Sequence, residues 1–301
     1  MDTIVETLTS RINLREISPV NDGSPDNSHD EILQALVRHP TLVRHIRLYR
    51  NFGEHNAVMC GLNHVTGDCV VIIYDDFQNS PSETLKLVDA LYTQDVDVVY
   101  SHYDVKQHSL FRNLGSFFND RVATFLLEKP RHLYLSSFKA IRADLVKVIV
   151  QYQGPYPYID GLILCSTNRI NRQLCRHDAR ANGKSSYTLN KLIHLWLNMS
   201  TGFSVTPLRV AADLGMASSA LAFLLINYFT LERIRGPIIH KIQIPPGWAS
   251  LIVAVTFFAG LQLSVMGLMG EYLGRLFLTI NGQPQYLIRD SYGADKRGED
   301  T

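Results

Sequence analysis

Two long apolar segments, residues 210–231 and 248–269, restrict the fold of this chain more than any other feature of its sequence. Each has about 22 residues, and an α-helix of that length spans about 33 Å, enough to cross a hydrocarbon core of about 30 Å. Asp213 stands near the start of the first segment, and the second has no charged residue. Buried core helices are the alternative interpretation, but they are seldom so long and so free of charge. The sequence therefore predicts two membrane-spanning helices.

The connection between the two segments, residues 232–247, is short and contains Gly236-Pro237 and Pro245-Pro246. A short connection makes an antiparallel hairpin, so the regions before and after it face the same side of the membrane. Basic residues stand both in the connection and at the outer ends, so the positive-inside rule does not select an orientation. The expected regions are a globular domain over 1–205, a transmembrane hairpin over 206–272 and a tail over 273–301.

The composition narrows the class of protein. The chain has 301 residues, a net charge of +1 and 46% hydrophobic residues, which permits one sizeable globular domain and a smaller part. Nucleic-acid-binding proteins are usually basic, so the near-zero charge argues against that class. The four cysteines form no CxxC pair, so we expect a reducing compartment and neither a zinc site nor a disulfide scaffold. The first residues lack the basic and apolar regions of a signal peptide.

A run of β-forming residues, Val70 to Tyr74, leads straight into Asp75 and Asp76. Such a run is typical of a strand that is buried on both faces of a sheet. Open α/β sheets bind ligands at the carboxyl ends of their strands, and carboxylates there can hold a hard divalent cation. A strand that ends in a solvated acidic turn is the alternative interpretation.

Strand-like and helix-like segments alternate along the first half of the chain. Residues 29–38 show helical spacing of apolar side chains, with Ser28 as the expected N-cap and Glu31 completing a capping box. The alternation predicts an α/β fold with a mostly parallel, doubly wound sheet. The other expected elements are strands over 43–48, 70–74, 96–103 and 138–141, and helices over 56–64, 82–91, 110–127, 143–151 and 188–199. The last helix is either an interfacial helix with Trp196 at headgroup depth or an ordinary core helix.

Three loops carry residues suited to a phosphorylated ligand. Asp22 lies in the acidic turn Asn21–Ser28, and Arg50 to Gly53 precede an expected helix start, where backbone N–H groups favour anions. The segment from Arg180 to Tyr187 is basic and contains Gly and Ser. An Asx turn with a helix cap, and a basic surface loop, are the alternative interpretations of the first and third loops.

The motifs NDGSPDNS, RNFG, GLNHVTGD, DDFQNSP and RANGKSSYTLNKL, followed by two apolar segments that end in GEYLGRLF, together resemble family-2 glycosyltransferases. The branch that the chain resembles is that of the polyprenyl-phosphate glycosyltransferases, relatives of dolichyl-phosphate mannose synthase that load sugars onto undecaprenyl phosphate in bacteria. The resemblance extends from Ile17 to Arg289. It implies a GT-A domain that binds a nucleotide sugar on the cytosolic side of the inner (plasma) membrane, in a multi-pass protein. It also implies Mg²⁺ or Mn²⁺ on the donor diphosphate and an inverting displacement.

The resemblance implies roles for individual residues. Asp22 matches the nucleoside-binding Asp, Asp76 matches the last carboxylate of the DxD motif and would ligate the metal, and Asp160 is the candidate beside the acceptor. The pattern RxxGxSxY near the phosphates is matched by Arg180, Gly183, Ser185 and Tyr187. The implied catalytic residues are Asp76, Asp160 and Arg180, and the implied donor-binding and phosphate-binding residues are Asp22, Arg50, Gly53, Asp75, Gln78, Lys184, Ser185 and Tyr187.

The chemistry of the implied reaction needs little general base. A phosphate monoester has a second pKa of about 6, so a lipid phosphate is largely dianionic at neutral pH and can attack an anomeric carbon directly. The protein must position the two substrates and place positive charge on the departing diphosphate. The metal, Arg180 and Lys184 would supply that charge, and Asp160 would orient the acceptor.

Two positions depart from the family pattern. Tyr74 stands where the first DxD carboxylate is expected, and Asp75 would point to the other side of an extended strand. The family's first strand, which ends in a PVYNE-like turn, has no counterpart before Asn21, and Pro19 is disfavoured in a central strand. The chain therefore looks N-terminally shortened, and residues 17–20 are expected to form an irregular sheet edge.

The leading hypothesis is transfer of one sugar from a nucleotide-sugar donor to polyprenyl phosphate. The first alternative, which both departures favour, is a catalytically impaired membrane protein of the same fold that acts as a binding or assembly partner. A transporter or channel subunit is disfavoured, because two helices without a central charge offer no ion pathway. The sequence identifies neither the sugar nor the nucleotide, although uridine is the commoner nucleotide in this branch, and it leaves a homo-oligomer open.

Overall fold

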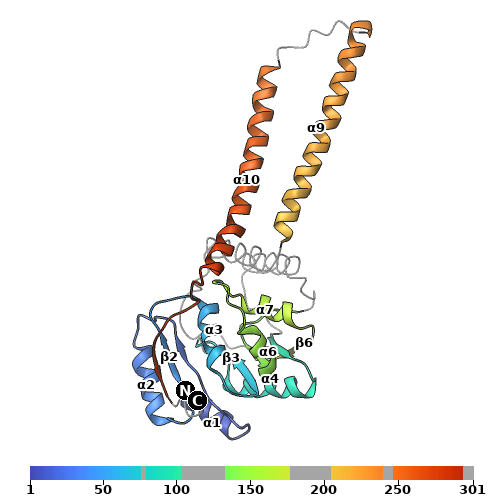
Figure 1. The fold of residues 1–301 in the computed structure, drawn as a ribbon. Helices are drawn as coiled ribbons and strands as arrows, with labels where there is room; N and C mark the ends of the chain where they lie inside the picture. The colour runs from blue at the N-terminus through green and yellow to red at the C-terminus, as the bar shows by residue number, and fades with distance from the viewer. Residues whose placement is uncertain (76–78, 104–132, 177–204, 240–246, 294–301) are drawn as a thin grey trace. The chain divides into compact units, whose positions relative to one another are not determined.

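Figure 1 shows the protein as a computed structural model, which describes residues 1–75, 79–103, 133–176, 205–239 and 247–293. The chain divides into two compact units. The first unit consists of residues 1–199 and 278–301, and the second of residues 200–277. The helices expected over 110–127 and 188–199 lie outside the described residues.

The first unit contains a four-stranded sheet in the order β3-β5-β4-β6. β5 lies between β3 and β4 and is antiparallel to both, whereas β4 and β6 pair in parallel. The α/β class is confirmed, but β5 runs against its neighbours and makes this sheet mixed rather than mostly parallel. The strands are β3 (Cys69–Ile72), β4 (Val98–His102), β5 (Lys139–Arg142) and β6 (Ile170–Leu174).

A second, three-stranded sheet has the order β1-β2-β7. β1 (Val20–Asn21) is parallel to β2 (His45–Leu48), and β7 (Ile288–Tyr292) is antiparallel to β2. The expected irregular edge is present, because Ile17 makes only an isolated bridge and the regular ladder starts after Pro19. Pro19 has no N–H to donate, but its carbonyl accepts the backbone N–H of Ile46 at 3.1 Å. β7 is not among the strands expected from the sequence.

One helix, α3 (Glu54–His64), joins the hydrophobic cores of the two sheets. Met59 and Leu62 pack in a cluster with Ile72 of β3, whereas Cys60 packs with Ile46 of β2. β1 and β3 are terminal strands of separate sheets, so no backbone ladder between them links the sheets. The apolar contacts of α3 therefore connect the two sheets.

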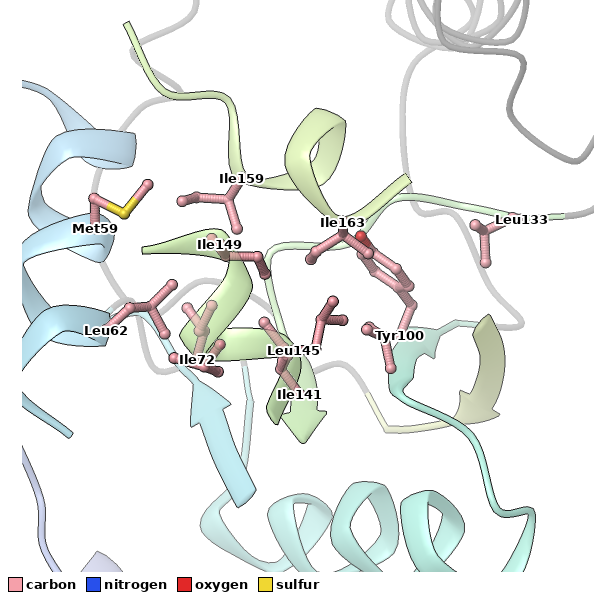
Figure 2. Packing of buried hydrophobic residues seen from close by; sticks show 12 residues of the cluster. Met59, Leu62, Ile72, Tyr100, Leu133, Ile141, Leu145, Ile149, Ile159 and Ile163 are labelled. Atoms are coloured by element: carbon pink, nitrogen blue, oxygen red, sulfur yellow. The ribbon is translucent and has the colours of Figure 1, made fainter. Parts of the chain in front are cut away.

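Helices cover both faces of the four-stranded sheet. Ile141 of β5 packs in the cluster of α6 (Ala143–Ile149) and α7 (Ile159–Ser166), and Figure 2 shows the inward-pointing side chains of this cluster. The neighbouring Ala140 packs on the opposite face, against α4 (Pro81–Thr93). Because successive strand residues alternate between faces, Lys139 shares the face of Ile141 and lies on the side of α6 and α7.

The expected helices over 29–38, 56–64, 82–91 and 143–151 are confirmed, with one correction at a helix start. α2 spans Ser28–Arg38, and its N-cap is Asn27 rather than the expected Ser28. The carboxylate of Asp26 accepts both the backbone N–H and the hydroxyl of Ser28, at 3.1 and 2.5 Å, so the side chain of Ser28 is already engaged. A further helix, α1 (Asp2–Thr9), packs on α4.

The second unit contains two long helices, α9 (Thr206–Ile239) and α10 (Trp248–Ile280) (Figure 1). In the described part of the chain one segment, Phe257–Ile280, is long and apolar enough to cross a membrane by length and composition. Its large apolar side chains are exposed, as in Leu263 with a relative exposure of 68%. The predicted hairpin is therefore supported for its second helix.

A cluster of aromatic rings packs β7 against β2 and α2 in the first unit. Nε2 of His45 lies 3.0 Å from Nδ1 of His29, and the ring of Tyr292 in β7 stacks on His45 with ring centres 5.8 Å apart. Nδ1 of His45 lies 3.3 Å from the carbonyl oxygen of Pro19. His45 is fully buried, and this burial lowers its pKa. The folded state therefore favours the neutral imidazole.

We expect the first unit to lose stability in mild acid. A histidine in an unfolded chain has a pKa of about 6.5, so below that pH the unfolded state binds more protons than the folded state at His45. The free energy of unfolding should then fall as pH is lowered through about 6.5, by at most about 1.4 kcal/mol per pH unit from this residue. Urea unfolding of the detergent-solubilised protein at several pH values measures the slope. His45→Gln should flatten it, and an unchanged slope in that variant would contradict the assignment.

Candidate active site

The strand that sequence analysis singled out ends beside the first turn of α3. β3 ends at Ile72, and Asp75 follows in an exposed turn. The hydroxyl of Tyr74 donates to Oε1 of Glu54 at 2.5 Å. Tyr74, at the position where the family pattern has a carboxylate, therefore holds the carboxylate of Glu54 near the end of β3.

Hydrogen bonds join the acidic turn to the RNFG segment at the start of α3. Oδ1 of Asp22 accepts the backbone N–H of Phe52 at 2.7 Å, and Oδ2 accepts that of Gly53 at 2.9 Å. Burial raises the pKa of Asp22, although these two hydrogen bonds act in the opposite direction. Gly53 is the N-cap of α3 at φ 95°, a conformation that favours glycine. Asp22 therefore has a structural role in fixing the start of α3.

The close approach of the acidic turn to the RNFG segment also depends on a glycine. A Cβ atom at Gly23, whose φ is +71°, would lie 2.8 Å from backbone atoms of Arg50 and Asn51. The guanidinium of Arg50 lies over the ring of Phe52, 4.9 Å from its centre, and Arg50 is exposed. The structure thus brings together three of the predicted donor-site residues, Asp22, Arg50 and Gly53.

Asp160, in the first turn of α7, belongs to a buried ion pair. Its Oδ1 atom accepts a hydrogen bond from the ammonium group of Lys139 and another from the hydroxyl of Tyr100, the latter at 2.8 Å. The ammonium also lies over the ring of Tyr100, 5.0 Å from its centre. Burial and the charge of Asp160 raise the pKa of Tyr100 well above its ordinary value, so its hydroxyl stays a donor.

Asp160 and Lys139 line a cavity of about 180 Å³ between α3, the end of β3 and α7. His55 of α3 also lines this cavity, and its ring meets that of Tyr158 edge to face with centres 5.0 Å apart. Burial lowers the pKa of His55, against the opposing effects of the charges on Asp160 and Glu54. The complete lining is Glu54, His55, Val58, Ile72, Tyr74, Leu135, Ser137, Lys139, Tyr158, Ile159 and Asp160.

The structure describes five of the predicted site residues, Asp22, Arg50, Gly53, Asp75 and Asp160. The described residues contain no group of three or more His, Cys, Asp or Glu side chains that could hold a metal ion. The other predicted site residues lie outside the described ranges, and they are Asp76, Gln78, Arg180, Gly183, Lys184, Ser185 and Tyr187.

Sequence reasoning missed His55 and Lys139, which line the cavity, and Tyr100, whose hydroxyl donates to Asp160. A signal for Lys139 was present, because a charged residue between Phe138 and Ala140 interrupts an otherwise apolar predicted strand. Lysine is almost never fully buried without a partner, so this pattern indicates a buried anion nearby. His55 and Tyr100 had no comparable signal, since both fit ordinary helix and strand positions.

Comparisons with known proteins agree with the resemblance. The family model for glycosyl transferase family 2 matches residues 1–150. The undecaprenyl-phosphate 4-deoxy-4-formamido-L-arabinose transferase of Edwardsiella ictaluri (strain 93-146) is 31% identical over 294 residues, which cover 95% of this chain and 86% of the relative. The transferase of the same name from Yersinia pestis bv. Antiqua (strain Angola) is 32% identical over 284 residues, with 93% and 85% covered.

Among solved structures, glucosyl-3-phosphoglycerate synthase from Mycobacterium tuberculosis, in complex with Mn²⁺, uridine-diphosphate-glucose and phosphoglyceric acid, aligns with a TM-score of 0.46 and 16% identity. That alignment covers 66% of this chain and 72% of the synthase. The assignment depends on the two relatives above 30% identity, because they extend over most of both chains. The chain is thus an enzyme that belongs to glycosyl transferase family 2, in the branch of the polyprenyl-phosphate glycosyltransferases.

Proposed function

We propose that this protein transfers one sugar from a nucleotide-sugar donor to polyprenyl phosphate at the cytosolic face of the inner (plasma) membrane. The relatives named undecaprenyl-phosphate sugar transferases support the acceptor class. The observation within the chain that carries the proposal is the cavity at the end of β3, which is lined by Asp160, Lys139 and His55. The relatives match over nearly the whole chain and are named as transferases, so they do not favour the catalytically impaired alternative.

The proposed reaction is a displacement with inversion at the anomeric carbon. An oxygen of the lipid phosphate forms a bond to this carbon, and the bond from the carbon to the donor diphosphate breaks. The nucleoside diphosphate leaves with the electron pair of the broken bond. The chain has to orient both phosphates and exclude water, and the basic side chains of Arg180 and Lys184 would bind the phosphate oxygens.

A divalent metal, Mg²⁺ or Mn²⁺, is part of the proposal. Asp75 places an exposed carboxylate directly after β3, and Asp76 is next in the sequence. Carboxylate oxygen is the ligand that both ions prefer, so these residues fit the group. When bound, the metal would neutralise charge on the diphosphate. At the family's first carboxylate position this chain has Tyr74. The hydroxyl of Tyr74 binds the carboxylate of Glu54, which adds negative charge nearby.

Catalysis should depend on Asp76. Asp76→Asn removes the carboxylate that is proposed to hold the metal, and we expect sugar transfer to undecaprenyl phosphate to fall at least about 100-fold, as it does when one electrostatic contact to a transition state is lost. The rate is measured as labelled lipid product, extracted into organic solvent, with a UDP-linked donor of 4-deoxy-4-formamido-L-arabinose, the sugar in the names of the relatives. Asp144→Asn is the matched control, because Asp144 is exposed on α6 and pairs only with Lys147 in the described part of the chain. Full activity of Asp76→Asn, or of the parent in EDTA, would contradict the metal assignment.

Both long helices are proposed to cross the membrane, which makes the protein multi-pass. The apolar segment Phe257–Ile280 supports one crossing, and the uncharged course of residues 214–231 in α9 supports the other. We expect the full chain to stay in the membrane fraction after carbonate or high-salt extraction, since two buried apolar helices hold it more firmly than surface charge does. Cysteines placed before α9 and after α10 should be labelled from the same side. Recovery of the chain in the soluble fraction, or labelling from opposite sides, would reject the hairpin.

The predicted nucleoside contact of Asp22 can be separated from its structural role. Asp22→Asn leaves one acceptor oxygen for the two N–H groups of Phe52 and Gly53 and turns an amide N–H toward the other. We expect the free energy of unfolding to fall by about 1–3 kcal/mol. Thermal unfolding with and without UDP measures both properties, and Asp144→Asn again serves as control. An unchanged melting temperature without ligand would contradict the structural role.

A further inference from the structure

Two strands of the first unit, β1 and β3, run in the same direction along α3. At one end, the carboxylate of Glu16, just before β1, accepts the backbone N–H of Thr66, shortly before β3, at 2.5 Å. At the other end, Asp22 after β1 and Tyr74 after β3 both bind the start of α3. β1 and β3 are nevertheless terminal strands of separate sheets, so each has one open edge without a neighbouring strand in the described part of the chain.

The hydrogen bonds on one side of β1 show which backbone groups face its open edge. The N–H of Ile17 donates to the segment that leads into β2, at 2.7 Å, and the carbonyl of Pro19 accepts an N–H of β2 at 3.1 Å. The backbone groups of successive residues in an extended strand point to opposite edges. The N–H and carbonyl groups of Ser18 and Val20 therefore point away from β2.

β3 has an open edge of the same kind. The carbonyl of Asp68 accepts the N–H of Ala143 at 3.0 Å, in register with the pairing of β3 and β5. By the same alternation, the backbone groups of Cys69 and Val71 point away from β5. Three of the four residues of β3 are only partly buried, although the strand is apolar. Each open edge therefore presents two N–H groups and two carbonyls to a further strand.

The polar side chain of Asn56 faces the boundary between the two sheets. Met59 of α3 packs in the cluster of β3, and Cys60 packs in the cluster of β2. Asn56 precedes these two residues by four positions or fewer, so it lies on the same face of the helix, between them. Its amide group donates to the carbonyl of Phe52, whereas its Oδ1 atom is buried and has no hydrogen-bond partner in the described part of the chain.

Ser18 presents a second buried oxygen on the α3 side of β1. A Cβ atom at Gly61 of α3 would lie 3.5 Å from Cγ2 of Val20, so the side chain of Val20 faces α3. Ser18, two residues earlier, shares that face, and its Oγ atom is likewise buried without a partner among the described residues. Buried polar atoms almost always have partners, so two such atoms along one boundary indicate a site for a further hydrogen-bonding element.

The separation of the two open edges suits one strand. β5, β4 and β6 lie on the far side of β3, so its open edge is the one nearer to β1. An α-helix is about 10 Å wide and neighbouring strands are about 4.8 Å apart, so two unpaired strands under one helix accommodate one strand between them. Asn56 lies about 7.5 Å along α3 from Gly61, and Ser18 lies about 6.6 Å along β1 from Val20 in the opposite direction. The two buried oxygens therefore span the length of about four strand residues.

We propose that β1 and β3 together bind one extended strand of a partner polypeptide, which pairs with Ser18 and Val20 on one side and with Cys69 and Val71 on the other. Addition of a strand to an open sheet edge is a recurring way of binding peptides, and here two edges hold the same strand. The residues of the strand that face α3 are apolar, apart from one serine or threonine whose hydroxyl donates to Oδ1 of Asn56.

The strand site lies outside the cavity of the candidate active site, which neither Ser18 nor Asn56 lines. A second copy of this chain is a poor source of the strand, because every strand in the described part of the chain is already paired in a sheet. A bound strand would join the two sheets into one hydrogen-bonded ladder from β2 to β5. It would thereby add backbone hydrogen bonds to the apolar contacts of α3 that connect the sheets.

Amide hydrogen exchange, resolved to single residues, tests the site on the full-length protein in detergent. The probe is a synthetic peptide of about five valine and threonine residues between terminal lysines, the length of an ordinary strand. Bound peptide should slow exchange at Ser18, Val20, Cys69 and Val71 about fivefold or more, the effect of one ordinary hydrogen bond. The same peptide with proline as its central residue should leave their exchange unchanged, because proline cannot donate to a ladder.

Two proline variants separate strand binding from folding. Val71→Pro removes an N–H that points away from β5, so the ladder to β5 is kept and the affinity for the peptide should fall about fivefold or more. Leu174→Pro is the matched control, because β6 is also a terminal strand. The next N–H, that of Cys175, donates to His102 of β4, so the N–H of Leu174 points away from β4. This variant should bind the peptide as the parent does.

Asn56→Leu keeps the test valid if Val71→Pro does not fold. The parent should bind the threonine-containing peptide about fivefold more tightly than a peptide of valine alone, and Asn56→Leu should lose that preference. No protection of the four amides, equal protection by the proline-containing peptide, or an unchanged preference in Asn56→Leu would overturn the strand site. Slow exchange at the four amides without peptide would show that another segment or a second copy occupies the edges, and would reject the partner strand.

Discussion

A lysine in the middle of a β-sheet determines the arrangement of the site. Lys139 lies in β5, which is paired on both sides, so its side chain leaves the sheet into the apolar layer beneath α6 and α7. A buried ammonium without a counter-charge costs several kcal/mol. The first turn of α7 must therefore bring Asp160 to it, and Tyr100 on the adjacent strand completes the contact with its hydroxyl. The position of α7, and with it one wall of the cavity, follows from this requirement.

The opposite wall depends on a separate constraint at the start of α3. Asp22 holds the backbone N–H groups of Phe52 and Gly53, and Gly23 lets the two loops approach closely. These contacts fix the first turn of α3, which carries Glu54 and His55 into the cavity. The buried side chains of α3 in turn pack against both sheets. The acidic turn is therefore connected to the cavity through the first turn of α3.

Local sequence patterns predicted most of the elements but not the way that the sheets assemble. The apolar run before Asp75 and the helical spacing after Ser28 identify β3 and α2, because both patterns follow from burial of one element against a core. The antiparallel insertion of β5 and the pairing of β7 with β2 join residues far apart in the chain, and no local pattern records them. Asp160 was recognised by its resemblance to a family position. The sequence marks Lys139 as a charged residue inside an apolar strand, but its pairing with Asp160 depends on the fold, which brings β5 and α7 together.

The ion pair between Lys139 and Asp160 keeps a carboxylate in the cavity that does not have to act as a base. Among the described residues, Lys139 and Tyr100 both donate to Oδ1 of Asp160, so the negative charge is stabilised at that oxygen. The lipid phosphate is itself a dianion near neutral pH and needs no proton removed before it attacks. The proposed displacement therefore needs no base in this cavity. In the proposed reaction, the positive charge that the diphosphate needs has to come from other residues and the metal, because the ammonium of Lys139 is already paired with Asp160.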